Sequence, residues 1–120
     1  MNLASKIISA VIILKKWQLD PQQRMILLGC KSTEELSKIE NPPTLILPIE
    51  NLIQRVNLII SIDKFLRLFF NNPVNINNFM TLVNKNNPYN GKRPLDLAMS
   101  NLAGFIKVTK TIEAMIYYRT

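Results

Sequence analysis

Apolar residues near the N-terminus recur every three or four positions, which is the spacing of a helix that buries one face. Leu3, Ile7, Val11 and Leu14 follow this spacing, and the pattern continues as far as Trp17. It predicts a first helix over this stretch. A membrane span needs about 20 apolar residues, and this apolar run is far shorter. We therefore interpret the helix as part of a core and expect no membrane association.

A second helix is predicted from its capping residues. Asp20 supplies an N-cap, and Pro21 takes the first helical position, where its missing N–H costs nothing. Gly29 is a typical stop in the left-handed conformation. The helix therefore runs from Pro21 to about Leu28.

A third, short helix is predicted to begin at Ser32. The spacing of Ser32 and Glu35 is that of a capping box, in which the hydroxyl and the carboxylate each bond the other residue's backbone N–H. The pattern continues to about Ile39. Prolines then end it, because proline lacks a donor and drives the preceding residue out of the helical region. We place the boundary between an N-terminal region, 1–49, and a C-terminal region, 50–120, in this proline segment.

The C-terminal region opens with a long apolar stripe that predicts a helix of about 19 residues from Asn51, a length well above the usual three turns. Its width indicates contacts on more than one side. The stripe comprises Leu52, Val56, Ile59, Ile60, Leu66 and Phe69, and is widened by Ile53, Ile62, Phe65 and Phe70.

Shorter elements follow this long helix. A helix carrying Ile76, Phe79, Met80 and Val83 precedes a polar loop at 84–91, and another helix starts at Pro94. The last helix is predicted over 102–118. Its inward residues are expected to be Leu102, Phe105, Ile106, Ile112 and Met115. No alternating strand pattern with a hairpin turn remains, so the chain is predicted to be all-α.

The composition argues against catalysis. Histidine is absent and Cys30 is the single cysteine, which removes the usual general base, the Ser-His-Asp triad and histidine-containing zinc sites. Glu34 and Glu35 are adjacent and point to different sides of a helix, so they do not form a catalytic pair. We expect no enzymatic activity, no cofactor and no metal. A lone thiol fits a reducing, cytoplasmic compartment.

Charge is unevenly distributed along the chain. The net charge is +7, with six basic and four acidic residues in 1–49 and nine against four in 50–120. The excess implies an acidic partner, a nucleic acid or an anionic membrane face. The chain also ends on two tyrosines and an arginine, residue types that often anchor protein interfaces. This C-terminal tail comprises Tyr117, Tyr118, Arg119 and Thr120.

Residues 20–39 have the rhythm of a helix-turn-helix, whose second helix would enter the DNA major groove. The candidate DNA-contacting residues are Lys31, Ser32 and Lys38. An ordinary pair of short packed helices would give the same rhythm. The second helix also carries three carboxylates, Glu34, Glu35 and Glu40, which would be repelled by phosphates.

The stretch from Asn87 to Ser100, followed by a long helix, resembles the toxin-binding domain of the Xre/MbcA/ParS antitoxins. In that family an Asn-Pro pair, a short loop, a glycine, two residues and Pro-Leu-Asp-Leu precede the final helix. This chain has Asn87-Pro88, Gly91 and Pro94-Leu95-Asp96-Leu97. The Phe-rich end of the long helix before Pro73 is similar as well. The sequences Trp17-Gln18-Leu19 and Ile26-Leu27-Leu28-Gly29 are similar to the family's degenerate helix-turn-helix half.

The resemblance implies a type II antitoxin that blocks the active site of a cognate toxin, commonly an NAD-degrading RES-domain enzyme, with its C-terminal helix and tail. It also implies a homodimer. Arg119 suits a catalytic carboxylate, which a guanidinium holds with two hydrogen bonds. The expected partner-binding residues are Asn87, Pro88, Gly91, Lys92, Arg93, Pro94, Lys110, Tyr117, Tyr118, Arg119 and Thr120.

Two positions depart from the family pattern. Acidic residues occupy the second helix of the helix-turn-helix half, and Arg93 stands where a Ser or Thr cap is usual. Two other functions remain open. One is a DNA-binding regulator, with operator DNA as its partner. The other is an all-α scaffold that self-associates through its long apolar helix.

Overall fold

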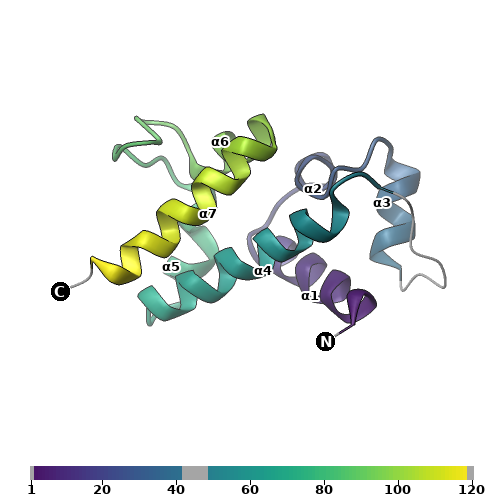
Figure 1. The fold of residues 1–120 in the computed structure, drawn as a ribbon, viewed down its shortest axis with the longest axis horizontal. Helices are drawn as coiled ribbons and strands as arrows, with labels where there is room; N and C mark the ends of the chain where they lie inside the picture. Colours follow the sequence, from purple (N-terminus) through teal and green to yellow (C-terminus); the bar gives the residue numbers. More distant parts are fainter. Residues whose placement is uncertain (1, 42–48, 119–120) are drawn as a thin grey trace. The chain divides into compact units, whose positions relative to one another are not determined.

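The computed structural model describes residues 2–41 and 49–118, and within these ranges the predicted all-α fold is confirmed (Figure 1). A lone antiparallel bridge joins Asn84 and Lys92. The elements are α1 (Leu3–Lys16), α2 (Pro21–Leu28), α3 (Thr33–Glu40), α4 (Leu52–Phe69), α5 (Pro73–Asn78), the 3₁₀ turn η1 (Phe79–Thr81), α6 (Pro94–Ser100) and α7 (Leu102–Tyr117).

The chain forms two compact units, Met1–Ile60 and Ser61–Thr120, which divide inside α4. The boundary expected between 49 and 50 lies earlier. The difference has a physical basis in the first turns of α4. The guanidinium of Arg55 donates to the carbonyls of Ile26 and Leu27 at 3.3 Å, and Lys6 Nζ donates to Asn57 Oδ1 at 3.3 Å. These bonds attach the start of α4 to the first unit. The prolines at 42, 43 and 48 lie outside the described residues.

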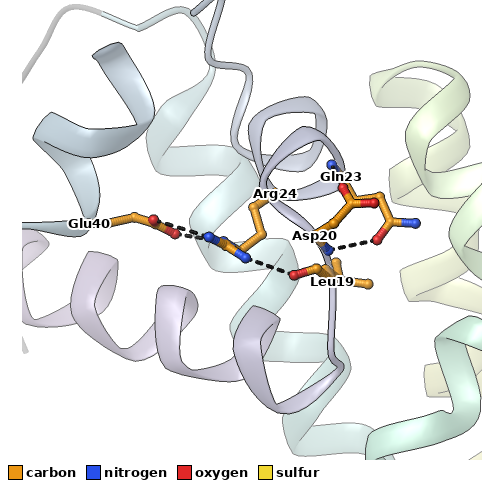
Figure 2. A network of polar contacts seen from close by, with 5 residues as sticks. All are labelled: Leu19, Asp20, Gln23, Arg24 and Glu40. Atoms are coloured by element: carbon orange, nitrogen blue, oxygen red, sulfur yellow. Dashed lines mark hydrogen bonds and ion pairs between the residues drawn. The ribbon is translucent and has the colours of Figure 1, made fainter. Parts of the chain in front are cut away.

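The ends of α2 match the prediction. The Asp20 carboxylate accepts the Gln23 N–H at 2.8 Å, and the Gln23 side chain accepts the Asp20 N–H at 2.9 Å (Figure 2). These reciprocal bonds satisfy donors that the first helical turn leaves free. At the other end, Gly29 has φ 79°, the left-handed conformation that a side chain would strain.

The capping box predicted at α3 is half confirmed. The Ser32 hydroxyl accepts the Glu35 N–H at 3.2 Å. The Glu35 carboxylate, however, accepts the N–H of Lys31 at 2.6 Å and not that of Ser32. It therefore satisfies a donor of the turn that precedes the cap, which ties the turn between α2 and α3 to α3.

The buried stripe of α4 is narrower than the sequence predicts. The buried apolar residues are Leu52, Val56, Ile59, Ile62 and Leu66. Ile53, placed on the widened stripe, is 57% exposed. Asp63 is buried on the same helix, and its carboxylate is paired with Arg67 Nε at 2.8 Å. This ion pair joins residues one turn apart, with the carboxylate on the buried side of α4 and the guanidinium mostly exposed.

The helix predicted to carry Val83 ends earlier. Its α-helical part is α5, the chain tightens into η1 at Phe79, and Val83 is 65% exposed outside any helix. Val83 belongs instead to the chain that enters the loop, because the next residue, Asn84, pairs with Lys92. Val83 matches the helical spacing of Ile76, Phe79 and Met80 although it lies outside the helix.

Helices α6 and α7 pack closely because Gly104 has no side chain. A Cβ atom at this position would overlap the Leu97 carbonyl and lie 2.6 Å from Ser100 Oγ. Asn101, between the helices, caps α7 by accepting the Gly104 N–H at 2.7 Å. The tight turn fixes the direction in which α7 leaves α6.

This packing decides which face of α7 is buried. Gly104, Phe105, Val108, Thr109 and Ile112 are buried. Phe105 and Ile112 were predicted correctly. Ile106, Leu102 and Met115 were also placed inward, but they are half-buried because the face toward α6 is centred on Gly104 and Val108.

Candidate functional site

The loop before α6, residues 84–93, is held by hydrogen bonds along its own backbone. The Asn84 N–H donates to the Lys92 carbonyl at 3.0 Å, and the Gly91 N–H donates to the Asn84 carbonyl at 2.9 Å. Asn90 and Gly91 follow each other in the left-handed region, with φ 53° and 92°. Two such residues in succession need glycine or asparagine. Gly91 therefore supplies one of the two left-handed conformations that the loop needs.

An aromatic side chain anchors this loop in the second unit. Tyr89 is buried, and its ring meets that of Phe79 edge-on with centroids 6.4 Å apart. Phe79 in turn contacts Phe70, with centroids 6.0 Å apart. Burial raises the pKa of Tyr89 to about 12. The buried ring therefore anchors the loop next to Asn87 and Pro88.

Tyr89→Phe is expected to stabilise the protein. Among the described residues, the buried Tyr89 hydroxyl has no hydrogen-bond partner, so its removal should raise the free energy of unfolding by about 1 kcal/mol. The raised pKa adds a pH dependence. Tyr89 ionises near pH 10 in the unfolded chain, so its ionisation leaves the stability of the wild type unchanged below that pH and lowers it as the pH rises toward about 12.

Urea denaturation at about pH 7 and about pH 11, on either side of the tyrosine pKa, measures both effects. The variant should lose less stability between the two values than the wild type. Tyr118→Phe is the matched control, because Tyr118 is 84% exposed and its hydroxyl should not affect folding. A Tyr89→Phe protein that is less stable at neutral pH contradicts this interpretation.

Arg93 takes the place of the expected Ser or Thr cap at the start of α6. An arginine cannot accept helix N–H groups, and Asp96 makes the reverse bond by accepting the Arg93 N–H at 3.0 Å. The Arg93 guanidinium also contacts the Asp96 carboxylate at 2.6 Å. Hydrogen bonds from Arg93 lower the pKa of Asp96. Arg93 is thus engaged within its own chain, and Pro94 beside it is buried.

A shallow open groove of about 570 Å³ runs along the outer face of α7, with the loop as one wall. Of the predicted partner-binding residues, the structure brings together Asn87, Pro88 and Lys110 here. The groove is lined by Asn87, Pro88, Ala103, Ile106, Lys107, Lys110, Thr111 and Ala114. Gly91 and Lys92 are exposed on the loop but do not line the groove.

The residues of α7 that form the floor of this groove were not predicted from the sequence. Ala103, Ile106, Lys107, Thr111 and Ala114 are absent from the predicted binding residues. Their signal is present in the sequence as a spacing of three and four residues on the face opposite the buried one. This spacing was not recognised because it includes Ile106, and an isoleucine on an amphipathic helix is usually placed inward.

The described part of the tail is exposed at the end of α7. Tyr117 is 75% exposed and Tyr118 is 84% exposed. Arg119 and Thr120, the other predicted tail residues, lie outside the described residues. Two aromatic side chains are therefore presented to solvent, where they cost the fold nothing and are available to a partner.

The helix-turn-helix candidate is formed by α2, the turn at Gly29 and α3. Lys31 and Lys38 are exposed, and Ser32 is the α3 cap. The three carboxylates of α3 differ in their surroundings. Arg24 Nε binds Glu40 at 2.7 Å while another of its nitrogens donates to the Leu19 carbonyl at 2.7 Å (Figure 2).

Glu35 is occupied by the Lys31 N–H, so Glu34 is the exposed carboxylate of α3 that has no such bond in the described structure. The repulsion of phosphates by α3 is therefore weaker than three free carboxylates would produce. The two exposed lysines are accompanied by one unengaged acidic group.

The described ranges offer neither a metal site nor a membrane span. No group of three or more Cys, Asp or Glu side chains there could hold a metal ion. None of the helices in these ranges combines the length and apolarity required to cross a membrane. Cys30 is half-buried, and burial together with Glu35 and Glu40 raises its pKa to about 11, so its thiol stays protonated and unreactive at neutral pH.

Comparison with known proteins gives no relative from which a role could be transferred. No protein-family model, curated protein or solved structure matches the chain.

Proposed function

We propose that this chain is the antitoxin of a type II toxin-antitoxin system, and that it neutralises its toxin by covering the toxin's active site with α7 and the tail. The proposed toxin is a RES-domain enzyme that degrades NAD. The proposal begins from the resemblance of residues 87–100 to the Xre/MbcA/ParS antitoxins. In this proposal the chain acts as a binding partner and catalyses no reaction itself.

One observation carries the proposal. The preorganised loop at Asn87-Pro88, the basic face of α7 and the exposed Tyr117 and Tyr118 belong to one compact unit. A surface that is already ordered loses little conformational entropy when it binds, which favours tight inhibition. Tyrosine is one of the residue types enriched at protein interfaces, and both tyrosines are exposed.

Co-expression tests this function. We expect a RES-domain enzyme to be encoded beside the gene for this chain. That enzyme should arrest growth when induced alone, and induction of both proteins should restore growth. Recovery should be matched by the recovery of cellular NAD. A RES-domain neighbour that arrests growth equally in the presence of this chain contradicts the proposal.

DNA binding is the second candidate, and it is favoured by the engagement of Glu35 and Glu40 described above. If α3 contacts phosphates, Lys31→Ala/Lys38→Ala should weaken binding to the chain's own promoter. The loss of two phosphate contacts should reduce the slope of log affinity against log salt by about 1.8. A gel shift at about 50 and about 200 mM salt measures this change.

Lys64→Ala/Lys85→Ala is the matched control for the DNA experiment, because both lysines are exposed and lie outside α2 and α3. This pair should leave the salt slope unchanged. The absence of any shift, or a shift that the α3 variant does not alter, excludes the helix-turn-helix as a DNA-binding element. The neutralisation function would stand in that case, because it depends on the other unit.

A further inference from the structure

The floor of the groove on α7 has the geometry of a helix-packing surface. Its residues are spaced three, one, three, one and three positions apart, so they occupy one face of the helix. From the first to the last the face extends about 16 Å, or about three turns. A second helix of similar length could lie along it, with Asn87-Pro88 at its side. The face is formed by Ala103, Ile106, Lys107, Lys110, Thr111 and Ala114.

The chemistry of this face favours protein over nucleic acid. Ala103 and Ala114 are small and lie at the two ends, so the backbone of another helix could approach closely. Ile106 and Pro88 add an apolar contact that a phosphate backbone would not fill. Lys107 and Lys110 are exposed and project from the same face. Mixed apolar and cationic contacts are suited to an amphipathic protein segment with carboxylates.

The charges within the second unit leave these lysines without intramolecular partners in the described structure. Residues 61–120 hold eight basic and three acidic side chains, a net charge of +5. Two of the acids, Asp63 and Asp96, are paired with Arg67 and Arg93. The third, Glu113, is on α7 but does not line the groove. An acidic partner would therefore meet an unbalanced positive surface.

We infer that this groove receives an amphipathic helix of the toxin that carries two carboxylates, spaced to meet Lys107 and Lys110, beside small apolar residues. The inference rests on the proposed function and deepens it. It assigns to the groove a contact that is separate from insertion of the tail. The groove would supply orientation and association rate through its charge, while the tail would cover the active site.

A designed peptide tests the groove directly. The probe is a labelled, alanine-rich helical peptide of about 15 residues with two glutamates at i and i+3 and a leucine on the same face. Fluorescence anisotropy should show binding to the full chain. Lys107→Glu/Lys110→Glu should reduce the affinity by about tenfold or more, the effect of losing about 1.4 kcal/mol. A peptide with lysines in place of the glutamates should bind this variant better than it binds the wild type.

Lys38→Glu/Lys64→Glu is the matched control, because it makes the same change in net charge at two exposed lysines that lie outside α7 and the loop 84–93. It should leave peptide affinity close to that of the wild type. Equal binding of the glutamate peptide and a glutamine version would overturn the inference. So would equal losses in the two charge-reversed proteins, or a groove that binds a DNA oligonucleotide more tightly than the peptide.

The outcome is separable from that of the proposed function. Lys107→Glu/Lys110→Glu should also lose neutralisation in the growth experiment, whereas the control pair should keep it. If the wild type protects and the groove variant protects equally, the groove assignment fails and the antitoxin function stands. If the wild type fails to protect, the function fails whatever the peptide shows.

Discussion

Gly104→Ala is expected to lower the free energy of unfolding by about 2 kcal/mol or more, the cost of forcing extra volume into a packed contact. The new Cβ atom would overlap the Leu97 carbonyl and lie 2.6 Å from Ser100 Oγ. The carbonyl belongs to the backbone of α6 and is separated from α7 by a very short connection. It has little freedom to move aside. Intrinsic helix propensity predicts the opposite sign, because alanine favours a helix over glycine by about 1 kcal/mol.

Urea denaturation followed by circular dichroism measures this change, and Gly91→Ala is an informative control. A Cβ at Gly91 would meet no atom within 4 Å. In that variant the loss of stability comes from backbone strain at φ 92°. We expect a loss of about 1 to 2 kcal/mol there, smaller than at Gly104. A Gly104→Ala protein at least as stable as the wild type would show that α6 and α7 do not pack as described.

Removal of residues 117–120 is expected to abolish neutralisation while leaving the fold intact. Tyr117 and Tyr118 are mostly exposed, so their loss removes little buried surface. At an interface, however, aromatic anchors each contribute about 2 kcal/mol or more. The loss of two such anchors should weaken toxin binding by more than about 100-fold. Survival under toxin induction reports this loss, and circular dichroism with urea denaturation should be unchanged.

Point variants separate the parts of the tail. Tyr117→Ala/Tyr118→Ala tests the aromatic contacts, and Arg119→Ala tests the guanidinium that is suited to hold a catalytic carboxylate. Tyr117→Phe/Tyr118→Phe is the matched control, because it keeps the rings and should retain protection. A truncated chain that protects as well as the full chain would show that the tail does not block the toxin.

Local signals in the sequence were sufficient to place both ends of α2 and the start of α6. Asp20-Pro21 and Gly29 mark the two ends of α2 through hydrogen bonds and a backbone conformation that neighbouring residues determine. Pro94 marks the start of α6 in the same way. Such features depend on a few consecutive residues, and for that reason they are readable before the tertiary structure is known.

Features that depend on packing could not be predicted in this way. Gly104 looked like an ordinary residue within the last helix, yet its missing side chain sets the approach of α6 to α7. That approach decides that Val108 is buried and that Ile106 faces the groove. The groove therefore follows from a contact between helices, and apolar spacing along one helix does not reveal it.

The charge carried by each face of the molecule was hard to predict for a related reason. Counting Glu34, Glu35 and Glu40 as free charges overstated the negative face of α3. Glu40 is held by Arg24 from the preceding helix, and Glu35 by a backbone N–H. Conversely, both aspartates of the second unit are paired with arginines. They therefore do not offset the charge of its lysines. The partner of each charge becomes known with the fold.

Hydrogen exchange on the co-purified complex tests the central claim most directly, because it locates the surface that the toxin covers. We predict a stable complex with a co-expressed RES-domain enzyme, in which the amides of Asn87 and of the last turns of α7 gain protection relative to the free chain. Amides of α2 and α3 should exchange as before. Failure to form a complex, or protection confined to α2 and α3, would contradict the claim that the second unit binds and blocks the toxin.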